Sequence, residues 1–267
     1  MQTKLLGDSN FYYRLYFYYE GVLMKNKLVA FILLIIFISL FIFSSIKVFT
    51  YLAENKENEE IIKEINTSIN IENNTTNADK LNYIIDFESL IEKNSDTVVF
   101  LILPGTGIEY PVVQSDNNEF YLSHNFKKNI NSAGWIFADY RNTLDGTDKN
   151  IIIYGHNMRN GKMFSKLKNY LNPSWYDQED HKKIYFITPD GANIYEIFSV
   201  YEIEDGEYYL KTDFNSNEFN NYINTIKLRS EIDFNVNITS DDSIITLSTC
   251  GNTNDYRIVI HAKRTTN

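Results

Sequence analysis

The sequence predicts a mainly β protein, a closed β-barrel with helical insertions that is preceded by N-terminal helices. Seven or eight short apolar segments, each stopped by turn-forming residues, follow residue 97. Between them, only two or three segments have apolar residues at helical spacing. This excess of strands over helices favours a barrel over a layered α/β fold. Hydrophobic residues make up 43% of the chain, which is enough to fill such a core.

The first element is expected to span a membrane. Residues 28–43 carry no charge, and the uncharged stretch continues to residue 46, long enough for a helix to cross a bilayer. No Ala-x-Ala cleavage site follows, so we expect an anchor rather than a cleaved signal peptide. Lys25 and Lys27 precede the stretch and Glu54 and Glu57 follow it, which predicts a cytoplasmic N-terminus and an extracellular remainder.

These features predict four parts: a cytoplasmic N-terminus at residues 1–27, an anchor at 28–49, an extracellular stalk at 50–80 and a folded domain at 81–267. In the stalk, Ile61, Ile62, Ile65 and Ile69 recur at roughly helical spacing, so a stalk helix is expected. Met24 is followed by Lys-Asn-Lys and the apolar stretch, and we expect translation to start there.

The folded domain should begin with a short helix and continue mainly as strands. Apolar segments predict the strands, at residues 98–103, 109–113, 135–138, 151–154, 183–188, 194–203, 243–249 and 257–262. Helical spacing predicts the helices, at residues 86–93, 119–122, 162–170 and 215–228. The turn at residues 189–191 (Pro-Asp-Gly) should join two of the strands as a hairpin.

Charge and composition exclude several classes of function. A net charge of −10 argues against an extended nucleic-acid surface, so no nucleic-acid partner is expected. With one cysteine and no His-x-x-x-His spacing, neither a zinc site nor another metal or cofactor site is expected.

Cys250, the only cysteine, is the candidate nucleophile. It follows an apolar strand and precedes Gly251, a position that a scaffold can hold while a loop leaves it accessible. Arg257 opens the next strand, and an antiparallel pairing of the two strands would bring its guanidinium close to the thiol. A fixed cation there favours the thiolate and can stabilise an oxyanion.

His156 is the candidate acid and base. It follows the buried strand at 151–154 and a glycine, so its position at a strand end mirrors that of Cys250, and a cysteine and a histidine so placed suit an activated thiol. His261 shares the predicted strand face of Arg257 and is the fallback. His124 and His181 lie in polar surroundings and are expected to be solvated.

The residues resemble the sortases, and class B in particular, from about residue 81 to residue 263. Thr-Leu-Ser-Thr-Cys at 246–250 resembles the family's Thr-Leu-x-Thr-Cys signature, with Arg257 where the family has its arginine. Residues 150–158 and 161–164 are similar to the histidine block of class B, and the helix at 215–228 resembles its extra helix.

The resemblance implies an eight-stranded sortase-like barrel and a membrane-anchored cysteine transpeptidase. Such an enzyme cleaves the C-terminal sorting signal of a surface protein at a Thr–x bond and transfers the protein to an amine of peptidoglycan or lipid II. Cys250 would form the thioacyl intermediate, His156 would move the protons, and Arg257 would hydrogen-bond the substrate or oxyanion. Ser248, Thr249 and Asn157 are the candidate substrate-binding residues.

Two alternatives remain open on the residues alone. A chymotrypsin-like cysteine protease shares the order of histidine before cysteine on β-barrels, but has no clear role for the arginine. A non-catalytic, membrane-tethered binding module would keep the barrel without the chemistry. L,D-transpeptidases place the histidine and arginine much closer to the cysteine, and papain-like enzymes place the cysteine first.

Overall fold

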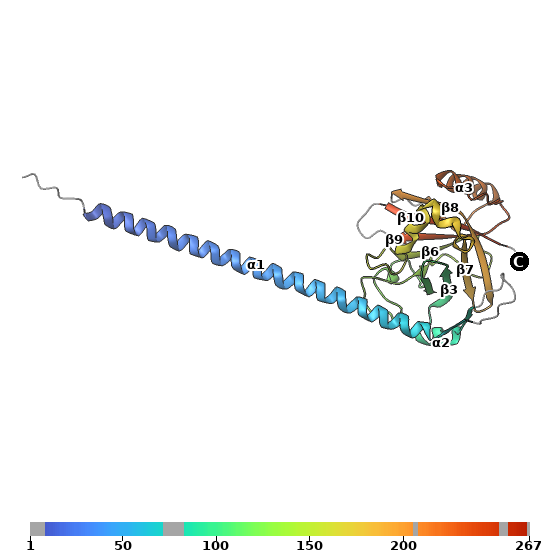
Figure 1. Cartoon of the computed structure of the whole chain (residues 1–267), viewed down its shortest axis with the longest axis horizontal. Helices are drawn as coiled ribbons and strands as arrows, with labels where there is room; N and C mark the ends of the chain where they lie inside the picture. The colour runs from blue at the N-terminus through green and yellow to red at the C-terminus, as the bar shows by residue number, and fades with distance from the viewer. Residues whose placement is uncertain (1–8, 72–82, 205–207, 251–255, 266–267) are drawn as a thin grey trace, which may run out of the picture. The chain divides into compact units, whose positions relative to one another are not determined.

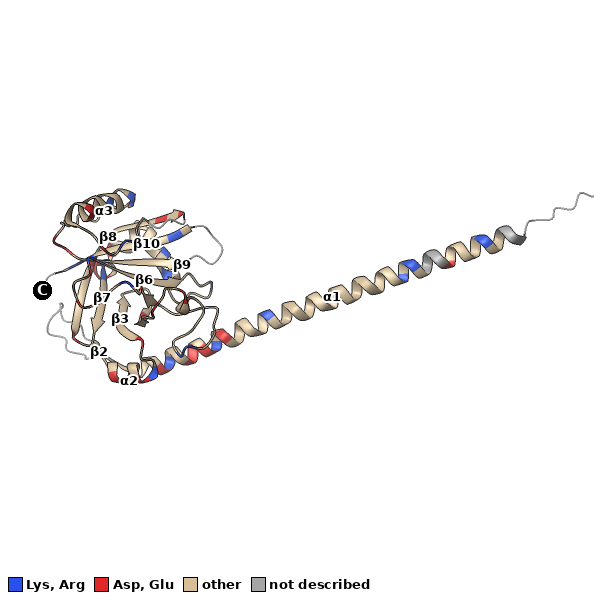
Figure 2. Ribbon diagram, turned by 180° about the vertical axis from the view of Figure 1, so that it is seen from behind, with Lys and Arg blue, Asp and Glu red and all other residues tan. Residues whose placement is uncertain are grey.

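The computed structural model describes residues 9–71, 83–204, 208–250 and 256–265. They belong to two compact units, Met1–Ala53 and Glu54–Asn267. The helix α1, Ser9–Asn66, runs through the first unit and ends in the second. In the first unit the apolar side chains of residues 28–46 are exposed, and Figure 2 shows this part of α1 free of charge. Among the described residues, α1 is the one helix long and apolar enough to span a membrane.

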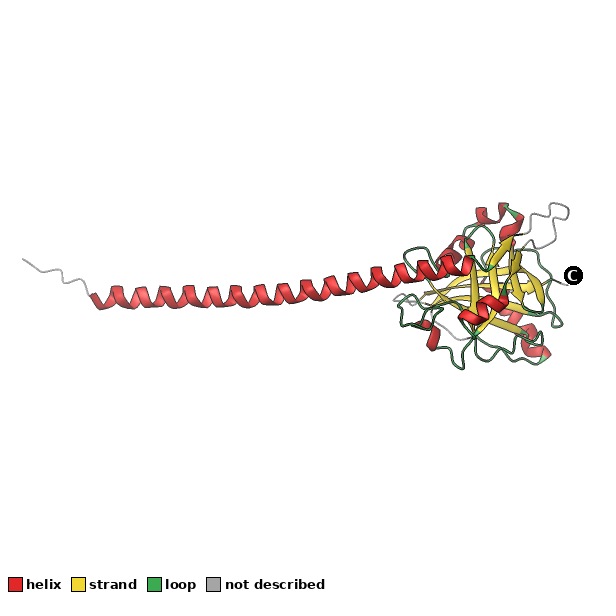
Figure 3. Cartoon of the chain, turned by 90° about the horizontal axis from the view of Figure 1, so that it is seen from below, coloured by secondary structure: helices red, strands yellow, loops and turns green. Residues whose placement is uncertain are grey.

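The second unit is a closed barrel of eight strands in the order β10-β8-β7-β3-β4-β5-β6-β9. Figure 3 shows that the strands gather in this unit, with loops and short helices around them. The strands are β3 Thr97–Leu103, β4 Ile108–Val113, β5 Phe137–Ala138, β6 Asn150–His156, β7 Lys183–Thr188, β8 Gly191–Glu204, β9 Ile244–Cys250 and β10 Tyr256–Arg264. All eight strands expected from the sequence are present, so the predicted closed barrel is confirmed. A separate two-stranded sheet pairs β1, Ile69–Ile71, with β2, Tyr83–Ile85.

Short helices lie between the strands. They are α2 Phe87–Lys93, α3 Ser216–Arg229 and the 3₁₀ turns η1 Phe120–Leu122, η2 Ser165–Leu171, η3 Pro173–Asp177 and η4 Glu179–Lys182. The helix expected at 162–170 is therefore a 3₁₀ helix that starts later. Met163 has a left-handed backbone (φ 52°) and pairs with Asn157 in an isolated bridge, which prevents an α-helical turn there.

At β8, β9 and β10 the barrel wall separates two apolar clusters, because alternate residues of a strand face opposite sides. In β10, Ile258 and Ile260 lie in the large interior cluster. Val259 lies in the smaller cluster, together with Phe219 and Ile226 of α3. Figure 1 shows α3 beside β8, consistent with this outer layer. Asn215 caps α3, since its side chain accepts from the backbone N–H of Glu218 in a capping box.

The compact unit starts at Glu54, whereas the sequence suggested a folded domain from residue 81. Residues 54–66 continue α1 instead of forming a separate stalk, and Ile61 and Ile65 are buried in the interior cluster. Ile69 lies beyond the end of the helix, in β1. Burial of these isoleucines joins the segment to the barrel unit, a contact that the helical spacing alone could not assign to a partner.

Candidate active site

The ends of β6 and β9 bring His156 and Cys250 together. The two strands are parallel neighbours over seven residue pairs, and the last pair is His156 with Cys250. The sequence placed each residue just after its strand. In the structure each is the last residue of its strand, because the backbone pairing of β6 with β9 continues as far as these two residues. The backbone of Cys250 is described, and its side chain lies outside the described part of the chain.

The tautomer of His156 is set by a backbone carbonyl. Nε2 lies 2.7 Å from the Leu122 oxygen. Because a carbonyl can only accept, Nε2 carries the proton and Nδ1 holds a free lone pair. Nδ1 is buried and has no hydrogen-bond partner among the described residues. Nδ1 of His156 is therefore a basic nitrogen to which no described residue donates a hydrogen bond.

Burial lowers the pKa of His156 below its ordinary value of 6.5. The hydrogen bond to Leu122 acts against this shift, and the positive charge of Arg257 adds to it. The imidazole is therefore mostly neutral at pH 7. A neutral imidazole can accept a proton from a thiol and return it later.

Two glycines, Gly134 and Gly155, leave the space that the His156 ring and its neighbours occupy. A Cβ on Gly134, whose φ is +54°, would lie 2.4 Å from the Tyr121 oxygen and 2.9 Å from Cδ2 of His156. A Cβ on Gly155 would lie 2.7 Å from the ring of Phe164. Either side chain would displace a group that packs around His156. The contact with the Leu122 carbonyl and the role of Gly134 were not found from the sequence, because a backbone contact leaves no pattern in side-chain types.

Arg257 lies close to the same strand ends. The antiparallel β9–β10 pairing runs from Ile244 with Lys263 to Ser248 with Val259, and two further residues on each strand bring Arg257 level with Cys250. The Arg257 guanidinium is half-buried and donates to the backbone oxygen of Thr249 at 3.3 Å. The barrel thus gathers the three candidate catalytic residues from three consecutive strands of the wall.

The candidate substrate-binding residues are placed differently. The Ser248 and Thr249 side chains are buried, with Ser248 Oγ 3.1 Å from the Tyr209 hydroxyl and Thr249 Oγ1 accepting from the Ile258 N–H at 2.9 Å. Asn157 is exposed beside His156. A role in substrate binding stays a prediction for all three, and Asn157 is the one whose side chain solvent reaches.

The other histidines make structural contacts. His261 is buried between the Tyr201 and Thr246 hydroxyls, at 2.9 Å from each, and cannot serve as the fallback base. The expectation that His181 is solvated is wrong, because its ring is buried and stacks on Trp175. His124 is half-buried, with Nδ1 2.7 Å from the Phe120 oxygen. Among the described residues, no group of three or more His, Cys, Asp or Glu could hold a metal ion.

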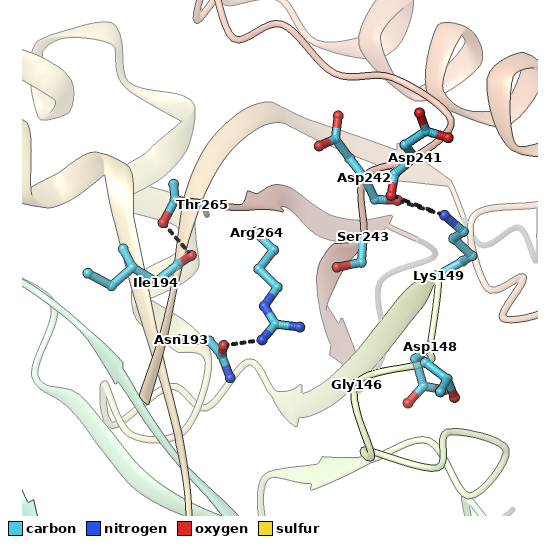
Figure 4. A pocket seen from close by; sticks show the side chains of 11 residues that line it. Gly146, Asp148, Lys149, Asn193, Ile194, Asp241, Asp242, Ser243, Arg264 and Thr265 are labelled. Atoms are coloured by element: carbon cyan, nitrogen blue, oxygen red, sulfur yellow. Dashed lines mark hydrogen bonds between the residues drawn. The ribbon is translucent and has the colours of Figure 1, made fainter. Parts of the chain in front are cut away.

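A polar cavity of about 470 Å³ lies at the other end of the barrel wall, where β6 and β9 begin and β10 ends (Figure 4). The two cationic side chains that line the cavity hydrogen-bond to residues beside them. The Lys149 ammonium donates to the backbone oxygens of Ser240, Asp241 and Asp242, and the Arg264 guanidinium donates to Asn193. None of the candidate catalytic residues lines this cavity, so it is separate from the site at His156 and Cys250.

Known proteins match this fold and this order of residues. The family model of the sortase domain matches residues 101–265. Sortase B of Listeria monocytogenes is 38% identical over 221 residues, which cover 80% of this chain and 88% of that protein. The structure of Clostridium perfringens sortase B covers 67% of this chain and 100% of its own, at 36% identity and a TM-score of 0.63. A sortase B structure in complex with triglycine is 38% identical, with a TM-score of 0.64, and covers 67% of this chain and 85% of its own.

Proposed function

Because the chain belongs to the sortase family, and within it to class B, we propose that it cleaves a C-terminal sorting signal at a Thr–x bond with Cys250, His156 and Arg257. Class B sortases are cysteine transpeptidases that anchor surface proteins, and this chain is one of them. Family membership removes the chymotrypsin-like alternative. The pairing of His156 with Cys250 at adjoining strand ends is the observation that carries the assignment of residues.

The chemistry follows from the protonation state of His156. The neutral imidazole accepts the thiol proton as the Cys250 sulfur attacks the threonine carbonyl carbon and a C–S bond forms. The imidazolium then gives that proton to the leaving amine as the Thr–x C–N bond breaks. An incoming amine attacks the thioacyl carbon, His156 takes its proton, and the thiol leaves with that proton restored. No oxidant or cofactor enters this balance.

Arg257 is assigned to the substrate or the oxyanion. Its guanidinium lies at the strand ends and donates to the Thr249 oxygen, so its planar fork is oriented there. A directed donor can stabilise the charge that develops on the carbonyl oxygen of the substrate. Its positive charge also adds to the lowering of the His156 pKa, most of which comes from burial.

The acceptor and the location are inferred from chemistry and from the relatives. A relative in complex with triglycine supports an acceptor with a free glycine amine, such as a cell-wall peptidoglycan amine or that of lipid II. The exposed apolar side chains of α1 support a single membrane-spanning anchor. The lysines before that stretch and the acidic residues after it support a cytoplasmic N-terminus and a barrel outside the cell.

The test compares Cys250→Ala with the unmodified chain on a library of threonine-containing sorting-signal peptides, with triglycine as the acceptor. We expect the unmodified chain to form a thioacyl adduct visible by mass spectrometry and a ligated product. Cys250→Ala should form neither, because the chain has no other thiol. Turnover by Cys250→Ala above about one part in a hundred would reject the thioacyl mechanism. An unmodified chain that forms neither species would instead support the non-catalytic binding module.

A further inference from the structure

The loop at residues 122–134 touches His156 at both of its ends. At one end the Leu122 oxygen accepts from Nε2, and at the other a Cβ on Gly134 would lie 2.9 Å from the imidazole. Backbone hydrogen bonds close the loop on itself, from Asn131 N to Ser123 O at 2.9 Å and from Gly134 N to Asn131 O at 3.1 Å. A shift of this loop therefore moves the acceptor that orients the histidine.

The last turns of α1 hold this loop through a buried pair of amides. Asn58 Nδ2 donates to Asn131 Oδ1 at 3.0 Å, and Asn131 Nδ2 donates to the backbone oxygen of Glu54 at 3.2 Å. The relative exposures of Asn58 and Asn131 are 5% and 0%. The Glu54 carboxylate accepts from the Ser132 N–H at 3.1 Å and also from the Ser132 hydroxyl.

These contacts are costly to break. Leaving one partner of a buried hydrogen bond unsatisfied costs the full desolvation penalty of that polar group. Ile61 and Ile65 fix the part of α1 that carries Asn58. Phe126 of the loop and Trp135, directly after it, fix the loop, and all four residues belong to the interior cluster. The more exposed ion pair between Lys127 and Glu64, at 2.6 Å, adds little. The strength of the polar attachment thus lies at Glu54 and Asn58.

We propose that Glu54 and Asn58 of α1 are positioning residues for catalysis, which hold the 122–134 loop where the Leu122 carbonyl orients His156. The inference rests on the proposed function, in which His156 moves the protons. It gives the segment between the candidate membrane span and the barrel a part in the reaction. Neither residue touches the substrate, so each acts only through the loop.

The test uses the full chain in detergent with Asn58→Leu, which keeps the branched shape of the side chain and removes the donor. Glu59→Gln, at an exposed position of the same helix, is the matched control. We expect Asn58→Leu to lower kcat by at least about tenfold at a nearly unchanged KM, since small misplacements of catalytic groups cost up to about 10²-fold. The pKa of His156, followed by NMR and assigned with His156→Gln, should fall further, because the Leu122 hydrogen bond that raises it weakens.

A purely structural role would give another result. In that case Asn58→Leu lowers Tm while the folded protein keeps its kcat and the pKa of His156, and the inference is overturned. If Asn58→Leu does not fold, Glu54→Ala replaces it, since Glu54 is half-buried and its truncation leaves no buried amide unpaired. Glu54→Ala should lower kcat by at least about threefold, and an unchanged kcat would reject the inference. Activity that survives Cys250→Ala rejects the proposed function itself, so the two failures are distinguishable.

Discussion

At the scale of single residues, the site depends on backbone groups as much as on side chains. The Leu122 oxygen selects the Nε2–H tautomer of His156, and the Thr249 oxygen accepts from the Arg257 guanidinium. Gly134 leaves room for the imidazole beside the Tyr121 and Leu122 oxygens. The candidate catalytic side chains are thus oriented by carbonyls whose positions depend on the loops and strands that carry them.

Arg257→Lys separates a charge effect from a directed contact. A lysine keeps one positive charge, but it lacks the planar fork of donors. We expect turnover to fall by at least about tenfold, because losing one oxyanion donor costs about 10²–10³ in measured systems. The rate at which an alkylating probe modifies Cys250 should stay near that of the unmodified chain.

Arg264→Lys, at the far end of β10, is the matched control and should keep full turnover. Equal turnover in Arg257→Lys and in the unmodified chain would remove the directed contact and leave only the charge. Full turnover in Arg257→Ala would place the residue outside the site.

At the scale of elements, α1 has two parts with different surroundings. Residues 28–46 expose their apolar side chains, whereas Ile61 and Ile65 are almost completely buried in the barrel unit. Full burial of an isoleucine side chain contributes about 1.5–3 kcal/mol. The second part of α1 therefore belongs to the barrel unit in energetic terms, although the sequence assigned it to a stalk.

Truncation distinguishes the two parts. A chain that starts at residue 50 should be soluble, folded and active, because it loses only side chains that the barrel unit does not bury. A chain that starts at residue 81 loses two buried isoleucines and the partners of Asn131, so its free energy of unfolding should drop by at least about 3 kcal/mol. Urea unfolding of both chains measures the difference. Equal midpoints would show that residues 54–66 add nothing to the stability of the barrel.

At the scale of the whole molecule, a buried hydrogen-bond network links four neighbouring strands of the barrel. The Thr246 hydroxyl donates to Asn150 at 2.7 Å and accepts from Nδ1 of His261, while Nε2 of His261 accepts from the Tyr201 hydroxyl. These residues belong to β6, β8, β9 and β10, which are consecutive in the barrel. Burial lowers the pKa of His261 from 6.5 to about 3, so its imidazole is neutral at pH 7.

Burial of His261 makes the free energy of unfolding depend on pH in a defined direction. Because the folded pKa of His261 is below the unfolded value, the unfolded chain binds more protons, and stability falls as pH drops from 6.5 towards 3. The loss reaches about 1.4 kcal/mol per pH unit from this residue alone. His261→Gln cannot take up a proton, so its urea-unfolding free energy should change less between pH 6.5 and about 4.5. Parallel curves for the two proteins would contradict the assignment to His261.

The sequence by itself determined the strands, their closure into a barrel and the choice of candidate catalytic residues. Short apolar segments bounded by turn-forming residues specify strands, and a single cysteine followed by Arg257 leaves few candidates for the nucleophile. The tertiary structure alone decided which groups meet. The register of β6 against β9, the carbonyl of Leu122 and the docking of residues 54–66 are contacts between distant segments. Such contacts depend on the packing of whole surfaces, and local periodicity carries no information about the partner.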